Sequence, residues 1–262
     1  FFVSASLQDM IRSLEKRGIP LKDFSEYYAV QLNDTHPAIA VAELMRLFVD
    51  DHHLEWDEAW EIVHKTIAYT NHTLLPEALE TWDLKLFKTL LPRHLEIIYE
   101  INSRFLQVVR LKYPGDVNMM EKMSIINESG NKSIRMANLA TIGSHHVNGV
   151  AELHSQLIKT QLMPEFYDLW PEKFTNVTNG VTPRRWLASS NEPLAKVLDE
   201  YVGEDWITNM DSLRKLEEQQ WDLDVLDKIE QTKLKGKHNL SVYIFDQLGI
   251  AVDPDSMFDV HV

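Results

Sequence analysis

The chain has 262 residues, 44% of them hydrophobic, and its formal net charge is -14. This apolar content excludes a disordered chain, and the negative charge argues against nucleic acid as a partner, because nucleic acid requires a positive face. The absence of cysteine excludes disulfides and thiolate metal sites. No apolar run approaches 18 residues, so we predict no membrane span, and with no signal-peptide pattern we expect a cytoplasmic protein.

The first elements are predicted from apolar spacing and from the residues that end each run. A helix is predicted over residues 7–17, which are followed by a glycine and a proline. A short strand is predicted over residues 28–32. The polar turn after it leads into a helix in which Pro37 suits the first turn and which ends near Asp51.

Further elements follow in chain order. Four apolar residues recur with helical spacing, namely Trp56, Trp60, Val63 and Ile67. One long helix is predicted after Pro92. A buried strand is predicted over residues 134–142 and, after a turn, a helix over residues 147–159. Residues 222–248 are expected to be helical with a break at Gly236, and residues 257–262 to form a strand.

These elements predict an α/β fold that is predominantly helical. The best candidate for a domain boundary lies near residues 180–183. Strand-to-helix connections are expected at residues 33–37 and 143–147. Ligands of open α/β sheets bind at the carboxyl ends of strands, so His36 and the region of His145 are plausible ligand-facing positions.

Two histidines in polar segments are candidates for ligand contact. His36 either contacts a ligand or satisfies backbone groups at a helix start. His72 lies between Asn71 and Thr73, and these polar groups interrupt an apolar run. Buried polar groups must be paired, and either a ligand or the protein itself can pair them.

Metal binding is not expected. His145 and His146 are adjacent, so they are expected to point in different directions, and the sequence offers no further ligands at suitable spacing. Glu77 and Glu80 lie one helical turn apart. Glycosidase carboxylates must flank a bond from two sides, so a solvated or helix-capping role is expected for this pair.

The segment Arg184-Arg185-Trp186 places two guanidinium groups beside an indole. Such a group can hold a phosphate or a carboxylate. An interdomain ion pair is the equally plausible alternative.

The polar segments occur in an order that matches a known family. The segments are 33–37, 68–80, 143–151 and 176–186, and further matching stretches are 2–12, 90–102, 113–117 and 256–260. Over essentially its whole length, the chain resembles the α-glucan phosphorylases, which act on glycogen, starch or maltodextrin.

The resemblance implies phosphorolysis of α-1,4-glucan at its non-reducing end, which yields glucose 1-phosphate. It also implies a two-domain, Rossmann-like glycosyltransferase fold of the GT-B type. Residues 1–179 would then be the carboxyl-terminal part of the first, glucan-binding domain, and residues 180–262 the start of the second, cofactor-binding domain.

The resemblance also assigns roles to residues. His72 and Asn179 would contact the glucosyl unit that is transferred, and Asp34 and His36 would line the sugar-binding cleft. Trp186 would lie near pyridoxal 5'-phosphate, whose phosphate group works with inorganic phosphate as an acid/base pair.

Two family features have no counterpart in these residues. The lysine that carries pyridoxal phosphate is expected outside this chain, and the basic pair that grips substrate phosphate is expected after Val262. We therefore expect a central fragment of an enzyme that is a homodimer when complete, and we expect the fragment alone to be inactive. The rival interpretation is a non-catalytic helical module that binds carbohydrate or serves as a scaffold.

Overall fold

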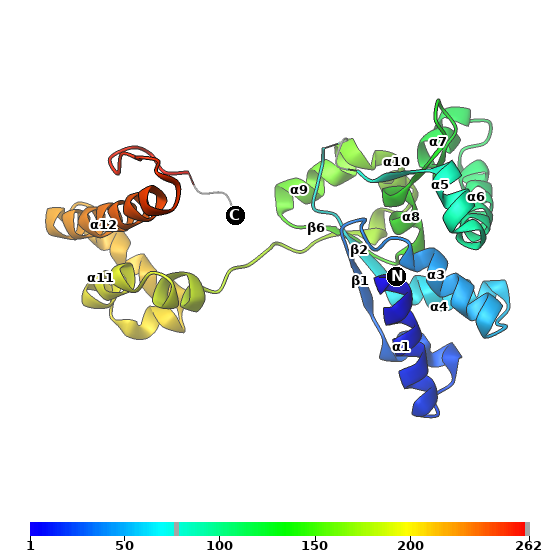
Figure 1. The fold of residues 1–262 in the computed structure, drawn as a ribbon, viewed down its shortest axis with the longest axis horizontal. Helices are drawn as coiled ribbons and strands as arrows, with labels where there is room; N and C mark the ends of the chain where they lie inside the picture. Colours follow the sequence, from blue (N-terminus) through cyan, green and yellow to red (C-terminus); the bar gives the residue numbers. More distant parts are fainter. Residues whose placement is uncertain (76–78, 260–262) are drawn as a thin grey trace. The chain divides into compact units, whose positions relative to one another are not determined.

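The computed structural model describes residues 1–75 and 79–259. The chain divides into two compact units, Phe1–Asn179 and Gly180–Val262 (Figure 1). This division, between residues 179 and 180, lies next to the candidate domain boundary near residues 180–183. The described part of the chain is mostly helical and contains a parallel sheet, which confirms the predicted α/β class. None of its helices combines the length and the apolarity needed to cross a membrane.

The first unit is built around a four-stranded parallel sheet with the strand order β1-β2-β6-β7. Its strands are β1 (Val30–Asn33), β2 (Ile67–Thr70), β6 (Val147–Gly149) and β7 (Phe174–Asn176). The connections between them carry the helices, as parallel strands require. Figure 1 shows β1, β2 and β6 side by side in the middle of this unit.

The α-helices among the described residues of the first unit are α1 (Phe2–Lys16), α2 (Phe24–Tyr27), α3 (Ala40–Arg46), α4 (Trp56–Thr66), α5 (Leu84–Leu90), α6 (Pro92–Lys112), α7 (Val117–Met123), α8 (Met136–Gly143), α9 (Glu152–Leu157) and α10 (Pro164–Leu169). A small antiparallel sheet has the order β3-β5-β4, from β3 (Thr81–Asp83), β5 (Ser133–Arg135) and β4 (Ile126–Asn127).

One continuous hydrophobic core holds the first unit together. In α1 the buried positions Leu7, Ile11 and Leu14 recur every three or four residues, so one face of the helix packs on α3. The strands contribute fully buried side chains such as Leu32 and Tyr69. The core therefore fixes the sheet, and the sheet fixes the loops that leave its edges.

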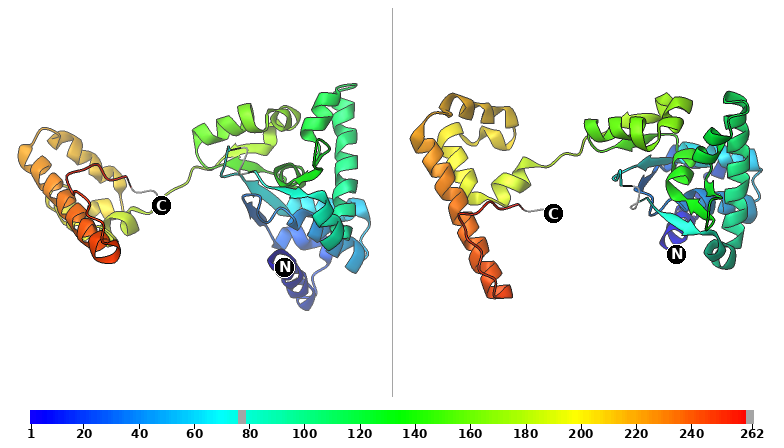
Figure 2. Two further views of the ribbon diagram at one scale, coloured as in Figure 1. Left: turned by 45° about the horizontal axis from the view of Figure 1, so that its top comes forward. Right: turned by 90° about the horizontal axis from the view of Figure 1, so that it is seen from above.

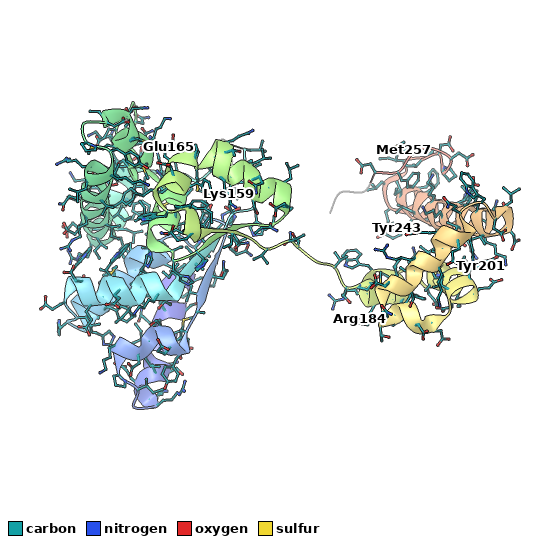
Figure 3. The ribbon with its side chains drawn as sticks, turned by 180° about the vertical axis from the view of Figure 1, so that it is seen from behind. Lys159, Glu165, Arg184, Tyr201, Tyr243 and Met257 are labelled. Carbon is teal, nitrogen blue, oxygen red and sulfur yellow. The ribbon has the colours of Figure 1, made fainter. Side chains whose placement is uncertain are left out.

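The ordered elements among the described residues of the second unit, 180–259, are all helices. It contains a π-helical turn at Arg184–Ser189, α11 (Glu192–Val202), 3₁₀ turns at Glu204–Ile207 and Met210–Gln219, and α12 (Leu223–Leu248). A small core forms around Trp206, whose indole nitrogen donates a 2.8 Å hydrogen bond to Asp199 Oδ1. In Figure 3, Arg184, Tyr201, Tyr243 and Met257 all lie in this unit, whereas Lys159 and Glu165 lie in the first.

The predicted strand over residues 134–142 is wrong. The strand β5 ends at Arg135, and α8 follows at once. Nearly every side chain of α8 is buried, so the segment lacks the polar face that distinguishes an amphipathic helix from a buried strand. Its polar residue Asn138 is satisfied locally, since Nδ2 donates to the carbonyl oxygen of Ser124 at 2.9 Å.

The predicted helix over residues 147–159 is wrong at its start. Val147–Gly149 is the strand β6, which pairs with β2 and β7, and α9 begins only at Glu152. Residues 143–147 are accordingly a helix-to-strand connection. His145, whose N–H donates to Ile67 O at 2.9 Å, lies at the amino edge of the sheet, opposite to the ligand-facing position expected for it.

Three smaller expectations also change. Ile67 begins β2 and is not part of the preceding helix, which ends at Thr66. The helix α12 runs through Gly236 without a break (Figure 2), because a single glycine weakens a helix by only about 1 kcal/mol relative to alanine. Residues 257–259 form no strand, and residues 260–262 lie outside the described residues.

Candidate functional site

The carboxyl ends of the four parallel strands meet at one edge of the sheet. Asn33 is level with Thr70, Thr70 with Asn148, and Gly149 with Asn176. The loops that follow these positions therefore all leave the sheet at its carboxyl edge. This is the edge at which open α/β sheets bind ligands.

The loop after β1 begins with an unusual backbone conformation at Asp34. Its φ is 62°, a left-handed value that aspartate tolerates better than most residues. The Asp34 N–H donates to Thr70 O at 2.9 Å, and its Oδ1 accepts from the Thr35 N–H at 2.7 Å. The loop is thereby tied to β2 and turned sharply after the strand.

Glu80 is held by the same loop. Its Oε2 accepts from the hydroxyl of the buried Thr35 at 2.7 Å, and its Oε1 lies 3.3 Å from His36 Nδ1. The side chain of His36 is 74% exposed. The sequence predicted a solvated or helix-capping role for Glu80. The contacts with Thr35 and His36 show that it has neither role. Its expected companion Glu77 lies outside the described residues.

The loop after β2 is anchored by Asn71, which is fully buried. Its backbone N–H donates to Asn148 O at 2.9 Å, and its side-chain Nδ2 donates to the Tyr69 hydroxyl at 3.0 Å. Burial raises the pKa of that phenol, so it stays neutral and can accept this bond. His72 follows directly and is exposed.

The loops after β6 and β7 are joined by backbone hydrogen bonds. The Val177 N–H donates to Gly149 O at 3.2 Å, and the Asn179 N–H donates to Val150 O at 2.9 Å. The side chain of Asn179 is exposed and takes part in no hydrogen bond among the residues that the structure describes. An amide that both donates and accepts is therefore presented at the edge of the sheet.

His154, on the first turn of α9, connects two of these loops. Its Nδ1 accepts from the Val150 N–H at 3.1 Å, and its Nε2 lies 3.0 Å from Asn71 Oδ1. Local sequence offers no reason to single out this residue, because it stands inside a predicted helix and its partner Asn71 is distant in the chain.

The sequence of this chain matches a known protein family over its whole length. The model of the carbohydrate phosphorylases matches residues 1–262. The chain belongs to the carbohydrate phosphorylase family.

Named relatives support this membership. A glycogen phosphorylase of Synechocystis sp. is 54% identical, over 100% of this chain and 31% of its own length. A glycogen phosphorylase of Chlamydia trachomatis is 49% identical, and the brain form from Bos taurus is 48% identical; this chain covers 32% of each. This phosphorylase-family chain thus spans about a third of the length of the relatives it matches.

The structure of this phosphorylase-family chain brings together four of the predicted site residues. Asp34, His36, His72 and Asn179 all lie on loops that leave the carboxyl edge of one sheet. Their roles toward a sugar stay a prediction. Trp186 belongs to the second unit, where it lies in the π-helical turn and is 54% exposed.

Two other clusters were singled out from the sequence. The rings of His145 and His146 do not diverge, since their Nδ1 atoms are 2.7 Å apart. Across residues 1–75 and 79–259, no group of three or more potential metal ligands is found. Arg184 and Arg185 are exposed, and no ion pair between described residues of the second unit involves either of them.

Proposed function

We propose that the polypeptide containing this chain is an α-1,4-glucan phosphorylase. In the proposed reaction, inorganic phosphate attacks the anomeric carbon of the terminal glucosyl unit. The bond from this carbon to the glycosidic oxygen breaks, and a bond to a phosphate oxygen forms. A proton passes to the glycosidic oxygen of the departing chain, so the products are glucose 1-phosphate and a glucan shortened by one unit.

The observation that carries the proposal is that loops carrying polar side chains converge at one edge of the sheet. Sugar hydroxyls need both donors and acceptors, and a binding site must gather these groups from several segments. The loops after β1, β2 and β7 provide a carboxylate, two imidazoles and an amide. Family membership over the whole chain supports glucan as the ligand.

The proposed roles follow from how each side chain is held. His72 and Asn179 contact the transferred glucosyl unit. Backbone hydrogen bonds hold Asn179 and Asn71, the residue before His72, while the side chains of His72 and Asn179 stay exposed. Asp34 and His36 line the cleft, and the contact with Glu80 orients the His36 ring. A sugar is positioned for reaction by side chains that are free to contact it and that extend from a rigid backbone.

The residues of the second unit fit the pyridoxal phosphate that the family implies. Arg184 and Arg185 are exposed cations, and Trp186 offers an exposed aromatic face, which suits a ligand with a phosphate and an aromatic ring. When bound, this cofactor supplies a phosphate group for acid/base chemistry. We propose that its attachment lysine is supplied by a segment outside these 262 residues, and that the complete enzyme is a cytoplasmic homodimer.

The decisive experiment measures glucose 1-phosphate formed from a short α-1,4-glucan and inorganic phosphate. It uses the complete polypeptide that contains residues 1–262, with and without added pyridoxal phosphate. Product that requires phosphate, glucan and cofactor supports the proposal. Glucan binding without any product would support the rival carbohydrate-binding module and contradict the proposed reaction.

A further inference from the structure

His154 has both ring nitrogens engaged with the protein. The Val150 N–H can only donate, so the Nδ1 atom that lies 3.1 Å away must be unprotonated and accept. The proton of the neutral ring is then on Nε2, which donates to Asn71 Oδ1 at 3.0 Å. The surrounding hydrogen bonds thus specify one tautomer of a neutral imidazole.

Each of these two bonds leads to a loop of the candidate site. Asn71 directly precedes His72, and its side-chain Nδ2 and backbone N–H donate to the Tyr69 hydroxyl and to Asn148 O. On the other side, Val150 uses its carbonyl oxygen to accept the Asn179 N–H at 2.9 Å. One imidazole therefore ties the segment that carries His72 to the segment that supports Asn179.

We propose that His154 is a positioning residue that sets the separation of His72 and Asn179 for the transferred glucosyl unit. This inference rests on the proposed function, because it takes those two residues as the sugar contacts. His154 itself need not touch the sugar. Its contribution is to hold two contacts from different strands in a single arrangement, which positional catalysis demands.

The electrostatic surroundings agree with a neutral ring. Burial lowers the pKa of His154, and the neighbouring His72 lowers it further, while Asp34 opposes them by raising it. The ring is half-buried. A protonated Nδ1 would also lose the bond from the Val150 N–H, so the linked arrangement belongs to the neutral form.

A purely structural role in starting α9 is the competing explanation, and three substitutions distinguish it. His154→Ala removes both bonds. His154→Asn places an acceptor near the former Nδ1 and keeps the bond from Val150, whereas His154→Gln places a donor near the former Nε2 and keeps the bond to Asn71. His146→Ala is the matched control, because this exposed histidine lies at the opposite edge of the sheet.

The kinetic test uses the complete polypeptide, a short α-1,4-glucan and inorganic phosphate. We expect His154→Ala to lower kcat/KM by up to about 100-fold, the effect of a misplaced reacting group. The asparagine and glutamine variants should each restore part of this loss, and His146→Ala should match the unmodified protein. In a His72→Ala background the same substitution should cost less, because the two residues act through one contact.

A second readout is independent of activity. Hydrogen exchange of the amides of Val150 and Asn179 should become faster in His154→Ala and stay slow in His154→Asn. Unchanged exchange and unchanged kcat/KM in His154→Ala would overturn the inference. Equal losses of kcat/KM in all three variants, each with a lower melting temperature, would also overturn it, because they would indicate a purely structural role. An unmodified polypeptide without phosphorolysis would instead refute the proposed function, and the exchange data would still show whether His154 links the two loops.

Discussion

Gly149 and Ser155 approach so closely that no side chain fits between them. A Cβ atom at position 149 would lie 2.5 Å from Ser155 Oγ and 2.9 Å from both the backbone nitrogen and the Cα of Ser155. The hydroxyl of this buried serine donates to Asn176 Oδ1 at 2.8 Å. The glycine therefore sets the distance from β6 to α9, the helix that carries His154.

We expect Gly149→Ala to destabilise the protein by about 1–3 kcal/mol, the usual cost of overpacking a close contact. The backbone of Ser155 cannot yield as a flexible side chain would. Thermal and denaturant unfolding of the variant measure the loss. A variant as stable as the unmodified protein would contradict the close approach of Gly149 to the backbone of Ser155.

Gly236→Ala is the control, because this substitution is expected to raise the stability of the protein. Gly236 lies within α12, and a Cβ built there meets no described atom within 4 Å apart from its chain neighbours and the backbone of its own helix. Alanine in a helix interior is favoured over glycine by roughly 0.5–1 kcal/mol. We expect this variant to unfold at a higher temperature than the unmodified protein.

Asn179→Ala tests the proposed sugar contact. The backbone of Asn179 is held by Val150 O, which the substitution leaves in place. Loss of the amide would leave a ligand hydroxyl unpaired at a cost of about 1–3 kcal/mol, which is roughly a 5- to 150-fold loss in kcat/KM. Steady-state phosphorolysis by the complete polypeptide measures it.

Asn131→Ala is the matched control for that substitution, because Asn131 is exposed and lies near the small antiparallel sheet. It should leave both kinetics and melting temperature unchanged. If Asn179→Ala lowers the melting temperature and leaves kcat/KM intact, Asn179 only stabilises its turn and the proposed contact is wrong.

The isolated 262-residue chain should not catalyse phosphorolysis. It spans about a third of the length of its relatives, and we propose that the cofactor lysine and the phosphate-binding basic pair are provided elsewhere. The measurement is glucose 1-phosphate formation by the purified chain against a control without protein. After dialysis, the chain should also show no absorbance from bound pyridoxal phosphate. Product above the control would refute the expectation that the chain is inactive.

Acid should destabilise the first unit through Glu43. Burial raises the pKa of this carboxyl, but hydrogen bonds from His94, Arg46 and Ser4 together outweigh burial and lower it from 4.5 to about 2. A lowered folded-state pKa contributes stability above the unfolded value, and this stability is lost as pH falls through the folded value. The loss should therefore develop between pH 4.5 and about 2.

Glu43→Gln checks the origin of that acid sensitivity. The variant should be less stable at neutral pH, because Arg46 loses the nearer of two charged partners, at 2.9 Å. Its free energy of unfolding should change less between pH 4.5 and about 2. Unfolding curves at several pH values give the comparison. An identical pH dependence in both proteins would assign the effect to other carboxyls.

Amphipathic helices were predictable from sequence, and fully buried or very short elements were not. The long helix after Pro92 was predicted correctly, since α6 extends from Pro92 to Lys112. The helix α8 was mistaken for a strand because burial on all sides removes periodicity. Strand β6, Val147–Gly149, is too short to show alternation, and only its pairing with β2 and β7 defines it.

The same distinction applies to the candidate site. Local sequence singled out His36 and His72, because each lies in a polar segment beside an apolar run, whereas the role of Asp34 was implied only by the family resemblance. His154 was missed because its importance depends on Asn71, which is adjacent only after β2 and β6 have paired. Local patterns identify loop residues, whereas residues that link loops need the tertiary fold.

The strand order also constrains how the chain acquires its structure during synthesis. The strands β2 and β6 are neighbours in the sheet, although the helices α5 to α8 separate them in the sequence. Such non-local pairing is slow, because loop closure must precede the contacts that stabilise it. The last strand, β7, ends at Asn176, so a nascent chain released from the ribosome earlier leaves one side of β6 unpaired. That open strand edge would be a site for aggregation.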